Sequence, residues 1–441
     1  MTCCTANILD FGADPTGASD SSAAIQAALD SLSEAGCLFI PKGNYRVENT
    51  IEHALSESWG GVTFQGEGPA SCVTWHGGNS RPVFHVRGVA GLGWYSRVLF
   101  ENFQVVGNCY TGSTPDGPVT ALYTGVPAIQ FGDSPEVATT GVCNPTVRNM
   151  LLRECGFGIL GYYESDEVAI YNNYIDRPEH YGICNAHGGS GWWIHCNHIS
   201  DGQASSTGIR ASLSSNIIED NIIQGGAFSV GVQVDGGISE GKAFSIRNNY
   251  LESQTAGDYA IVCYDADTGV IENNTFNGFA GAIIIRLVGA CNNVVIGANR
   301  HTQSAGAITS LIHADSSSTR CMVTAHQHTT GSVTTITGPF AYIAEHGGNY
   351  GFGTGAPHKK LVVSDEGTNG FEIEPREGDY TRLLSYNRTT NSYTPLYLEA
   401  SQLLTVAGAI DDYPDDSSAA SAGIPLYGFY RTGSALKIRV S

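Results

Sequence analysis

Basic residues and long apolar runs are scarce in this chain. Its 441 residues include 22 Lys and Arg against 42 Asp and Glu, which gives a net charge of -20. Such a charge repels a phosphate backbone, so nucleic acid is excluded as an expected partner. No stretch reaches the roughly 18 consecutive apolar residues of a membrane-spanning helix, so no membrane insertion is predicted.

The usual signatures of secretion, zinc binding and thiol redox chemistry are also missing. The start, MTCCTANILD, has neither a basic nor an apolar signal segment, and the 12 cysteines contain no Cys-x-x-Cys pair. We therefore expect most cysteines to be small buried side chains in a protein made in a reducing cytosol. His326 and His328 could share one face of a strand, but no third ligand accompanies them. No cofactor and no metal are predicted.

Glycine, in contrast, is abundant. It accounts for 55 of the 441 residues, whereas charged residues make up only 15%. Average proteins have about 7% glycine and about 25% charged residues. This composition favours a β architecture with many turns, and a hydrophobic content of 41% is enough for a substantial core.

A repeat of about 25 residues dominates the middle of the chain. An Ile precedes an Asn by three residues, and another apolar residue follows two positions later, at Asn173, Asn197, Asn221, Asn249 and Asn274. The row extends back to Asn149 and forward to Asn299. Asparagine tolerates a left-handed corner, and stacked amides can bond to one another, so this row is interpreted as structural.

A second row keeps the same period. A small residue precedes Ile or Val at Gly158-Ile159, Gly182-Ile183, Gly208-Ile209, Gly231-Val232, Ala260-Ile261 and Ala282-Ile283. Short strands at this spacing match neither helical repeats nor propeller blades. They predict an all-β parallel β-helix, in which successive coils stack at about 4.8 Å and equal positions form ladders.

The first 50 residues predict a cap for this solenoid. Asp20 is a candidate N-cap, and good helix formers with an amphipathic period predict a helix over about 20–34. Strands are expected at Cys37–Ile40 and near Tyr45–Val47, separated by a Pro-Lys-Gly-Asn turn. A cap is needed because an open solenoid end exposes unpaired backbone groups and apolar core.

The segment Asp10-Phe11-Gly12-Ala13-Asp14-Pro15-Thr16-Gly17, with the following helix and strand-turn-strand, resembles the opening of the pectate-lyase-like superfamily. The resemblance implies a right-handed parallel β-helix, and the superfamily includes many bacteriophage tailspikes. Many of these carry a separate virion-binding domain before the cap. None is evident here, so we expect that it was removed, that the protein hangs from another spike, or that it acts away from the virion.

After the glycine-rich stretch 347–355, short strand-like runs separated by turns predict a small antiparallel module. Its segments Phe371–Pro375, Leu384–Arg388 and Gly423–Ser434 are similar to C-terminal modules of phage tail proteins, which implies a homotrimer. The expected domains are the cap (1–50), the parallel β-helix (51–350) and the trimerisation module (351–441).

Period-two alternation indicates which side chains point outward. If the Ile of the second row points inward, Arg210 and Gln233 lie in one outward column, and Asp235, Tyr264 and Arg286 lie in the next. An aromatic ring, planar donors and an acid are suited to a sugar. Asp235 could alternatively be a surface ion-pair partner of Arg210.

Asp235, Asp265 and Asp267 are the candidate catalytic acids. Hydrolysis with inversion needs two carboxyl groups roughly 6.5 to 9.5 Å apart, which an offset pair on neighbouring coils can provide. A lyase would instead need a base and a group that neutralises a uronate, for which Arg210, Arg286 and Tyr264 are candidates.

Further candidates lie elsewhere on the coils. Glu179 and His187 are potential substrate-binding residues near the loop 176–181, and substrate grooves of the resembled family run along the corresponding strand face. A second-choice site combines His195, as a base, with Glu219. The alternating charges of Glu219, Arg247 and Glu272 are also explained by stacked ion pairs.

These observations favour a tailspike-like depolymerase that hydrolyses a bacterial surface polysaccharide. It would be assembled in the host cytoplasm, attached to a virion tail with other tail proteins, and act outside the cell. The alternatives are a lyase acting on a uronate-containing glycan and a tail fibre that binds the glycan without cutting it.

Overall fold

The computed structural model describes most of the chain between Thr5 and Val440. The described residues are 5–32, 36–55, 61–88, 97–110, 112–114, 117–119, 122, 124–133, 142–162, 165–186, 189–212, 215–226, 228–236, 243–252, 259–279, 283–303, 310–324, 327–328, 336–338, 340–342, 344–346, 349–352, 361–365, 369–375, 381–387, 389–394, 411–424, 426, 429–433 and 435–440. No helix among them is long and apolar enough to cross a membrane.

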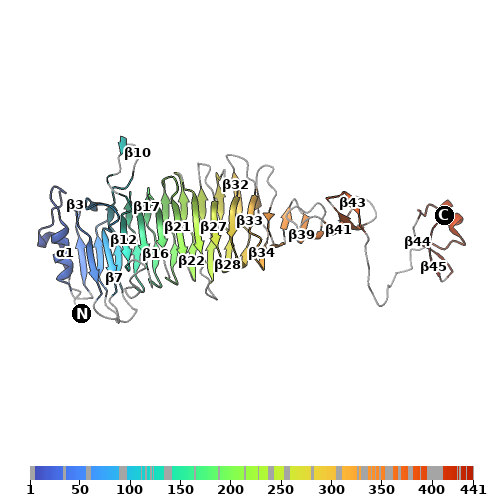
Figure 1. The fold of residues 1–441 in the computed structure, drawn as a ribbon, viewed down its shortest axis with the longest axis horizontal. Coiled ribbons are helices and arrows are strands. Elements are labelled where there is room, and N and C mark those ends of the chain that lie inside the picture. Colours follow the sequence, from blue (N-terminus) through green and yellow to red (C-terminus); the bar gives the residue numbers. More distant parts are fainter. Residues whose placement is uncertain are drawn as a thin grey trace. The chain divides into compact units, whose positions relative to one another are not determined.

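Three long parallel sheets form the body of the protein, which confirms the predicted parallel β-helix (Figure 1). Sheet A contains β1 (Thr5–Asn7), β2 (Cys37–Ile40), β5 (Thr63–Gly66), β8 (Leu99–Glu101), β13 (Thr146–Arg148), β16 (Ala169–Tyr171), β19 (Trp193–His195), β22 (Asn216–Glu219), β25 (Phe244–Arg247), β28 (Asp267–Glu272), β31 (Asn292–Ile296), β34 (Cys321–Val323) and β37 (Phe340–Tyr342).

Each coil then continues into the other two sheets. Sheet B contains β3 (Gly43–Val47), β6 (Ser71–Trp75), β9 (Gln104–Val106), β14 (Leu151–Arg153), β17 (Tyr174–Asp176), β20 (His198–Ser200), β23 (Ile222–Gln224), β26 (Tyr250–Glu252), β29 (Thr275–Asn277), β32 (Arg300–Gln303) and β35 (Gln327–His328). Sheet C contains β4 (Ile51–Ala54), β7 (Phe84–Arg87), β12 (Pro127–Phe131), β15 (Phe157–Gly161), β18 (Tyr181–Asn185), β21 (Thr207–Ser212), β24 (Val230–Asp235), β27 (Tyr259–Tyr264), β30 (Ile283–Val288), β33 (Ser310–Ala314) and β36 (Ile336–Thr337). A small hairpin, β10 (Gly112–Thr114) and β11 (Gly117–Val119), lies outside these sheets.

The core consists of stacked apolar side chains from equal positions of successive coils. In sheet A, Ile170, Ile194, Ile218, Ile246 and Ile271 pair in register and are all buried. Burying such a ladder removes a continuous apolar strip from water, which is the main stabilising contribution to a solenoid.

The glycines of the second predicted row are required by close packing. A Cβ on Gly208 would lie 2.7 Å from the Gly231 carbonyl oxygen of the next coil and 2.7 Å from Ile223 Cγ2. Neither neighbour can move without shifting a strand. The predicted register is confirmed from Ile159 to Ile261, but the next partner of Ile261 is Ile285, not Ile283. A slip of two residues keeps every side chain on the same face, so alternation alone could not detect it.

The asparagine ladder is confirmed, with one correction. Asn173, Asn197, Asn221, Asn249, Asn274 and Asn299 are buried, and each amide bonds to the next at 2.9 to 3.0 Å. The left-handed residues are the ones immediately before them, such as Asn172 (φ 57°) and Asp220 (φ 56°). Asn149 (φ 53°) is therefore a corner residue, and Met150 takes the ladder position, its N–H bonding to Asn173 Oδ1 at 3.0 Å.

The predicted cap is present. A 3₁₀ turn, η1 (Ile8–Phe11), precedes helix α1 (Ser22–Asp30), which covers the first coils with its buried residues Ile25, Ala28 and Leu29. The helix begins two residues later than predicted and ends at Asp30, about four residues earlier than predicted. The N-cap is Ser21 and not Asp20 as predicted, and its side chain makes no capping bond; the Asp20 carboxylate, one residue earlier, accepts the Ser22 N–H at 2.9 Å.

The predicted C-terminal strands are present as a six-stranded sheet. It contains β38 (Ala344–His346), β39 (Asn349–Phe352), β40 (Leu361–Asp365), β41 (Asn369–Pro375), β42 (Thr381–Asn387) and β43 (Ser392–Tyr393), with antiparallel pairing except between β39 and β40. This sheet belongs to a compact unit that ends at Tyr393. The second unit, Thr394–Ser441, contains α2 (Asp416–Ser421), β44 (Phe429–Thr432) and β45 (Ala435–Ile438). The predicted trimerisation module (351–441) includes most of this sheet and the second unit, and its role in trimerisation stays a prediction.

The described cysteines agree with the predicted structural role. Seven of the ten, including Cys184, Cys263 and Cys291, are buried. Burial raises the pKa of Cys291 to about 11, so its thiol stays protonated and unreactive at neutral pH.

Candidate functional site

The predicted polar patch lies on the outer face of sheet C. Arg210 is on β21, Gln233 and Asp235 are on the adjacent strand β24, and Tyr264 ends the next strand, β27. The register pairs Arg210 with Gln233 and Asp235 with Tyr264. Residues 23 and 29 positions apart in the sequence thus become neighbours because the coils stack in register.

Asp235 is held at both carboxylate oxygens. Arg210 Nε lies 2.6 Å from Oδ2, and Gln233 Nε2 donates to Oδ1 at 2.7 Å. The predicted pairing of Arg210 with Asp235 is therefore observed. Both side chains remain partly exposed, at 29% for Arg210 and 22% for Asp235. The carboxylate is consequently fixed in direction yet open to solvent, which suits a group that must meet a ligand in one orientation.

Arg210 is itself positioned by its surroundings. Its guanidinium lies 5.7 Å from the centroid of the Tyr181 ring on the preceding strand, which is within cation–π range. Burial opposes its charge, but Asp235 raises the pKa of the guanidinium above its usual value. Cys184 lies in the same column, paired with Arg210, and burial raises the pKa of its thiol to about 12.

Arg286 does not lie where the sequence placed it. Because of the two-residue slip, it pairs with Val262, in the same column as Arg210 and Gln233, and Tyr264 pairs with Val288. Arg286 Nη1 donates to the Tyr259 hydroxyl at 2.6 Å, and the guanidinium lies 5.4 Å from the centre of that ring. The structure therefore gathers Arg210, Gln233, Asp235 and Tyr264, and it places Arg286 two coils from Gln233, or about 10 Å at the inter-strand spacing.

The two further candidate acids have different environments. Asp265 follows Tyr264 at a left-handed corner (φ 46°), and its Oδ1 accepts the Ala290 N–H of the next coil at 2.8 Å. It thus lies one coil from Asp235, at the edge of the same face. Asp267 lies beyond the corner on β28 of sheet A, where its Oδ1 accepts from Asn293 Nδ2 at 2.9 Å. The structure does not bring Asp267 to the patch.

The remaining sequence candidates do not join this patch. Glu179 Oε2 accepts the Gly125 N–H at 2.8 Å and lies 3.7 Å from His180 Nε2, at the corner between sheets B and C. This contact links two coils that are separated by the coil of β15. His187, like His326 of the His-x-His pair, lies outside the described residues.

His195 and Glu219 are neighbours in register on sheet A. The His195 ring stacks between Tyr171 and Trp193, with centroid separations of 5.0 and 4.1 Å, and Trp193 Nε1 donates to Glu219 Oε1 at 2.9 Å. Burial lowers the pKa of His195 despite the opposing effect of Glu219. The predicted ion pair of Arg247 with Glu272 is present at 3.1 Å.

Aromatic residues outside the predicted patch take part in both assemblies. Tyr181 and Tyr259 lie two residues before the buried Ile183 and Ile261, yet their rings contact Arg210 and Arg286. Strict period-two alternation places both rings inward, so this pattern could not have found them. Alternation does place Trp193 outward, because it precedes the buried Ile194, and Trp193 is 46% exposed.

The chemistry available on sheet C is that of one anchored carboxylate, two arginines and several tyrosine hydroxyls. Tyrosine rings offer a face to a sugar, while the guanidinium groups can donate to hydroxyls or to a uronate carboxylate. No cluster of three or more potential metal ligands is found among the residues that the structure describes.

Comparisons with known proteins agree with this architecture. The family described as rhamnogalacturonase A/epimerase, pectate lyase-like, matches residues 5–80, which cover the cap and first coils. No curated protein matches the chain. ORF18 of Geobacillus virus E2 is similar in structure, with a TM-score of 0.54 and 13% identity over 98% of this chain and 86% of that chain.

Two similar structures are those of carbohydrate-active enzymes. A DFA-IIIase from Arthrobacter chlorophenolicus A6 gives a TM-score of 0.54 at 16% identity, covering 77% of this chain and 98% of that one. An exopolygalacturonase from Thermotoga maritima gives 0.53 at 13% identity, covering 78% and 92%. At these identities the likeness shows the fold, so function must be argued from the site.

Proposed function

We propose that this protein is a tailspike-like depolymerase that binds a bacterial surface polysaccharide on sheet C and hydrolyses it. The observation that carries the proposal is the Asp235 carboxylate, fixed by Arg210 and Gln233 and exposed beside Tyr264. The viral and glycan-degrading proteins among the similar structures support it. Its proposed place is a virion tail, together with other tail proteins.

For hydrolysis, Asp235 would activate water and Asp265 would supply the proton to the leaving group. Asp265 lies one coil on and one residue further along the strand direction, because the Gly236 N–H bonds to the Tyr264 carbonyl at 2.6 Å. This offset suits the wider carboxyl spacing of inverting enzymes, roughly 6.5 to 9.5 Å, which leaves room for a water molecule.

Asp235→Asn tests this assignment. We expect at least about a 100-fold loss of cleavage, because the amide cannot act as a base, with binding and oligomeric state unchanged. Asp267→Asn is the matched control, since Asp267 lies on sheet A. Viscosity and product size are measured on a panel of capsules and lipopolysaccharides. Undiminished cleavage by Asp235→Asn would remove this residue from the mechanism.

A lyase is the second candidate, favoured by the two arginine–tyrosine assemblies. Arg210 and Arg286 lie over Tyr181 and Tyr259 respectively, where a guanidinium could neutralise a uronate and a tyrosine could accept the proton. The products distinguish the chemistries. Unsaturated ends that absorb ultraviolet light indicate a lyase, plain reducing ends indicate a hydrolase, and binding without shortening indicates a non-catalytic tail fibre.

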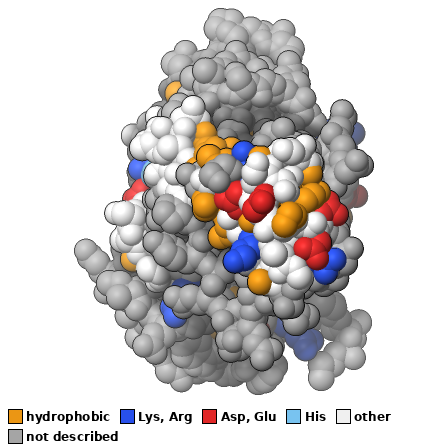
Figure 2. Space-filling model, turned by 90° about the vertical axis from the view of Figure 1, so that its right-hand side faces the viewer, with side chains coloured by type: hydrophobic (Ala, Val, Ile, Leu, Met, Phe, Trp, Pro, Cys, Tyr) orange, Lys and Arg blue, Asp and Glu red, His pale blue; other side chains and the backbone are white. Residues whose placement is uncertain are grey.

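We also propose that the protein is a homotrimer. The supporting observation is the apolar surface of the second unit, where Leu426, Phe429, Ile438 and Val440 are 48 to 69% exposed. Figure 2 shows exposed hydrophobic side chains next to acidic and basic ones. Such a surface on a small unit is suited to burial against other copies.

A further inference from the structure

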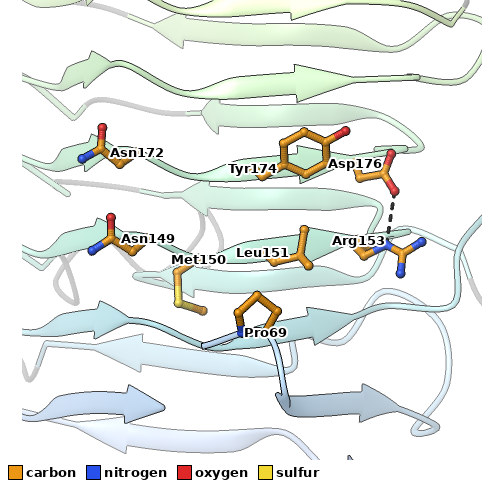
Figure 3. Close-up of a pocket in the computed structure, with 8 residues that line it drawn as sticks. All are labelled: Pro69, Asn149, Met150, Leu151, Arg153, Asn172, Tyr174 and Asp176. Carbon is orange, nitrogen blue, oxygen red and sulfur yellow. Dashed lines mark hydrogen bonds and ion pairs between the residues drawn. The ribbon is translucent and has the colours of Figure 1, made fainter. Parts of the chain in front are cut away.

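A groove of about 590 Å³ lies on the outer face of sheet B, whereas the patch around Asp235 lies on sheet C. Its walls come from strands β14 and β17 and from Pro69, in the turn before β6 (Figure 3). Its volume falls in the range of small-molecule sites, roughly 300 to 1,000 Å³. No repeat or motif in the sequence predicts this groove.

The middle of the groove is apolar and aromatic. Leu151 and Tyr174 pair in register on adjacent strands, and Tyr174 is 38% exposed. The ring is held in place from the far side, because His198 packs edge-on against it at 4.7 Å and Ser200 Oγ donates to its hydroxyl at 3.1 Å. A preoriented ring can receive a ligand without losing much side-chain entropy.

One end of the groove is formed by an ion pair. Arg153 Nε lies 3.2 Å from Asp176 Oδ2, and the same oxygen lies 2.9 Å from Nη2 of the buried Arg177. Arg177 Nη2 also lies 3.1 Å from Glu154 Oε1. Two guanidinium groups therefore fix the Asp176 carboxylate. The groove is lined at this end by the Arg153 guanidinium and the Asp176 carboxylate, two planar groups whose hydrogen-bonding directions are fixed by the ion pair.

The other end carries amides. Asn149 and Asn172 occupy the left-handed corners that precede the two strands, and both are exposed at the groove. Figure 3 shows them at the strand starts, with Leu151 and Tyr174 between them and the Arg153–Asp176 pair. The groove is thus apolar along its centre and polar at both ends.

The local charge selects against an anionic ligand. Three carboxylates, those of Glu154, Asp176 and Asp201, interact with only two guanidinium groups. Burial lowers the pKa of His198 despite Asp201 and Asp176, so the imidazole does not add a positive charge at neutral pH. An uncharged ligand avoids this excess of negative charge.

We infer that the sheet B groove binds an uncharged sugar segment of a glycan. The C–H face of a pyranose would pack on Tyr174 and Leu151, and its hydroxyls would bond to the Arg153–Asp176 pair and to the asparagine amides. The inference rests on the proposed glycan-directed function. It adds a binding site that lies on a different sheet from the site of cleavage and differs from it in charge preference.

The test is binding to an array of bacterial surface oligosaccharides, some with neutral repeats and some containing uronic acids. Tyr174→Ala should weaken binding to neutral glycans by about tenfold, the loss of one stacking contact. Tyr174→Phe should keep the binding, because it keeps the ring. The matched control is Tyr250→Ala, since Tyr250 occupies the same column on β26, where its hydroxyl donates to Glu252 at 2.6 Å.

Two results would overturn the inference: equal binding by Tyr174→Ala and the unaltered protein, or no neutral glycan bound by either. Failure of the proposed function would give a different result. The unaltered protein would then bind neutral glycans on the array and shorten no polysaccharide, and Tyr174→Ala would still lose the array binding. Leu151→Lys, which places a long side chain in the groove, should reproduce the loss. Thermal unfolding of each variant shows whether the fold is retained.

Discussion

At the scale of single residues, Asp14 explains why the opening segment of the chain holds its shape. Its carboxylate accepts the N–H groups of Thr16 and Ser19 at 2.9 and 2.8 Å and both of their hydroxyls at 2.6 and 2.8 Å. These bonds, first of all that from the Thr16 hydroxyl, hold the pKa of Asp14 well below its usual value of 3.8. The carboxylate therefore acts as a small template around which the loop folds.

Asp14→Asn should lower the thermal stability of the protein at pH 7. Because the folded-state pKa lies below the unfolded one, the contribution of Asp14 is complete above the unfolded pKa and is lost as the pH falls through the folded pKa. The difference in Tm between the unaltered protein and Asp14→Asn should therefore shrink steadily below about pH 4. Asp10→Asn, which removes the same charge four residues earlier, is the control. Equal effects of both changes would mean that net charge, and not the loop bonds, is responsible.

The contacts of particular residues show how far the sequence could predict the site. Arg210 and Asp235 were placed together correctly, because β21 and β24 preserve the spacing of the repeat. Arg286 was placed one column away from its true position, because the run Ile283–Ile285 fits the pattern in two registers of equal parity. The groove around Tyr174 was not predicted, because its depth depends on Pro69, about 100 residues earlier.

At the scale of elements, the asparagine ladder predicts a gradient of sensitivity along the solenoid. The side chain of Asn221 takes part in five hydrogen bonds, to Asn197, Ile194, Glu219 and Asn249. The side chain of Asn173, next to the Met150 end of the ladder, takes part in three. Each buried group left without a partner costs about 1 to 3 kcal/mol.

Asn221→Ala should therefore lower the free energy of unfolding by roughly 3 kcal/mol, and Asn173→Ala by about half as much. Urea unfolding followed by circular dichroism measures both values. Asn221→Ser should be more stable than Asn221→Ala only if the serine hydroxyl, directly or through a water molecule, bonds to a neighbouring coil. An equal cost at the two positions would contradict the view that bonds between neighbouring amides, and not only burial, stabilise the corner.

The coils also explain which elements were predictable. The Asn row and the Gly-Ile row predicted the sheets, because residues at the same position of successive coils stack on one another and have the same surroundings. The exact corner residue was not predictable at Asn149, because Asn suits both the left-handed corner and the ladder position next to it. Loops between coils vary in length, so periodicity gave no register there.

At the scale of the whole molecule, the two compact units should separate folding from assembly. The first unit, which ends at Tyr393, contains all three long sheets and the cap. Its stability comes from contacts between neighbouring coils, which do not require the residues that follow. The second unit exposes several large apolar side chains, which favours a role in holding chains together.

Ending the chain after Tyr393 should therefore leave a folded monomer. Light scattering should give three chains of 46.6 kDa for the full protein and one shortened chain for the variant, with β-sheet circular dichroism unchanged. Binding to a single oligosaccharide should be preserved, whereas binding to a polysaccharide-coated surface should fall by at least about 100-fold, because three linked sites rebind far more often than one. A shortened chain that still formed trimers would place the subunit contacts within residues 1–393. A monomeric full-length protein would contradict the proposed trimer, and its binding to a coated surface could not then be strengthened by avidity.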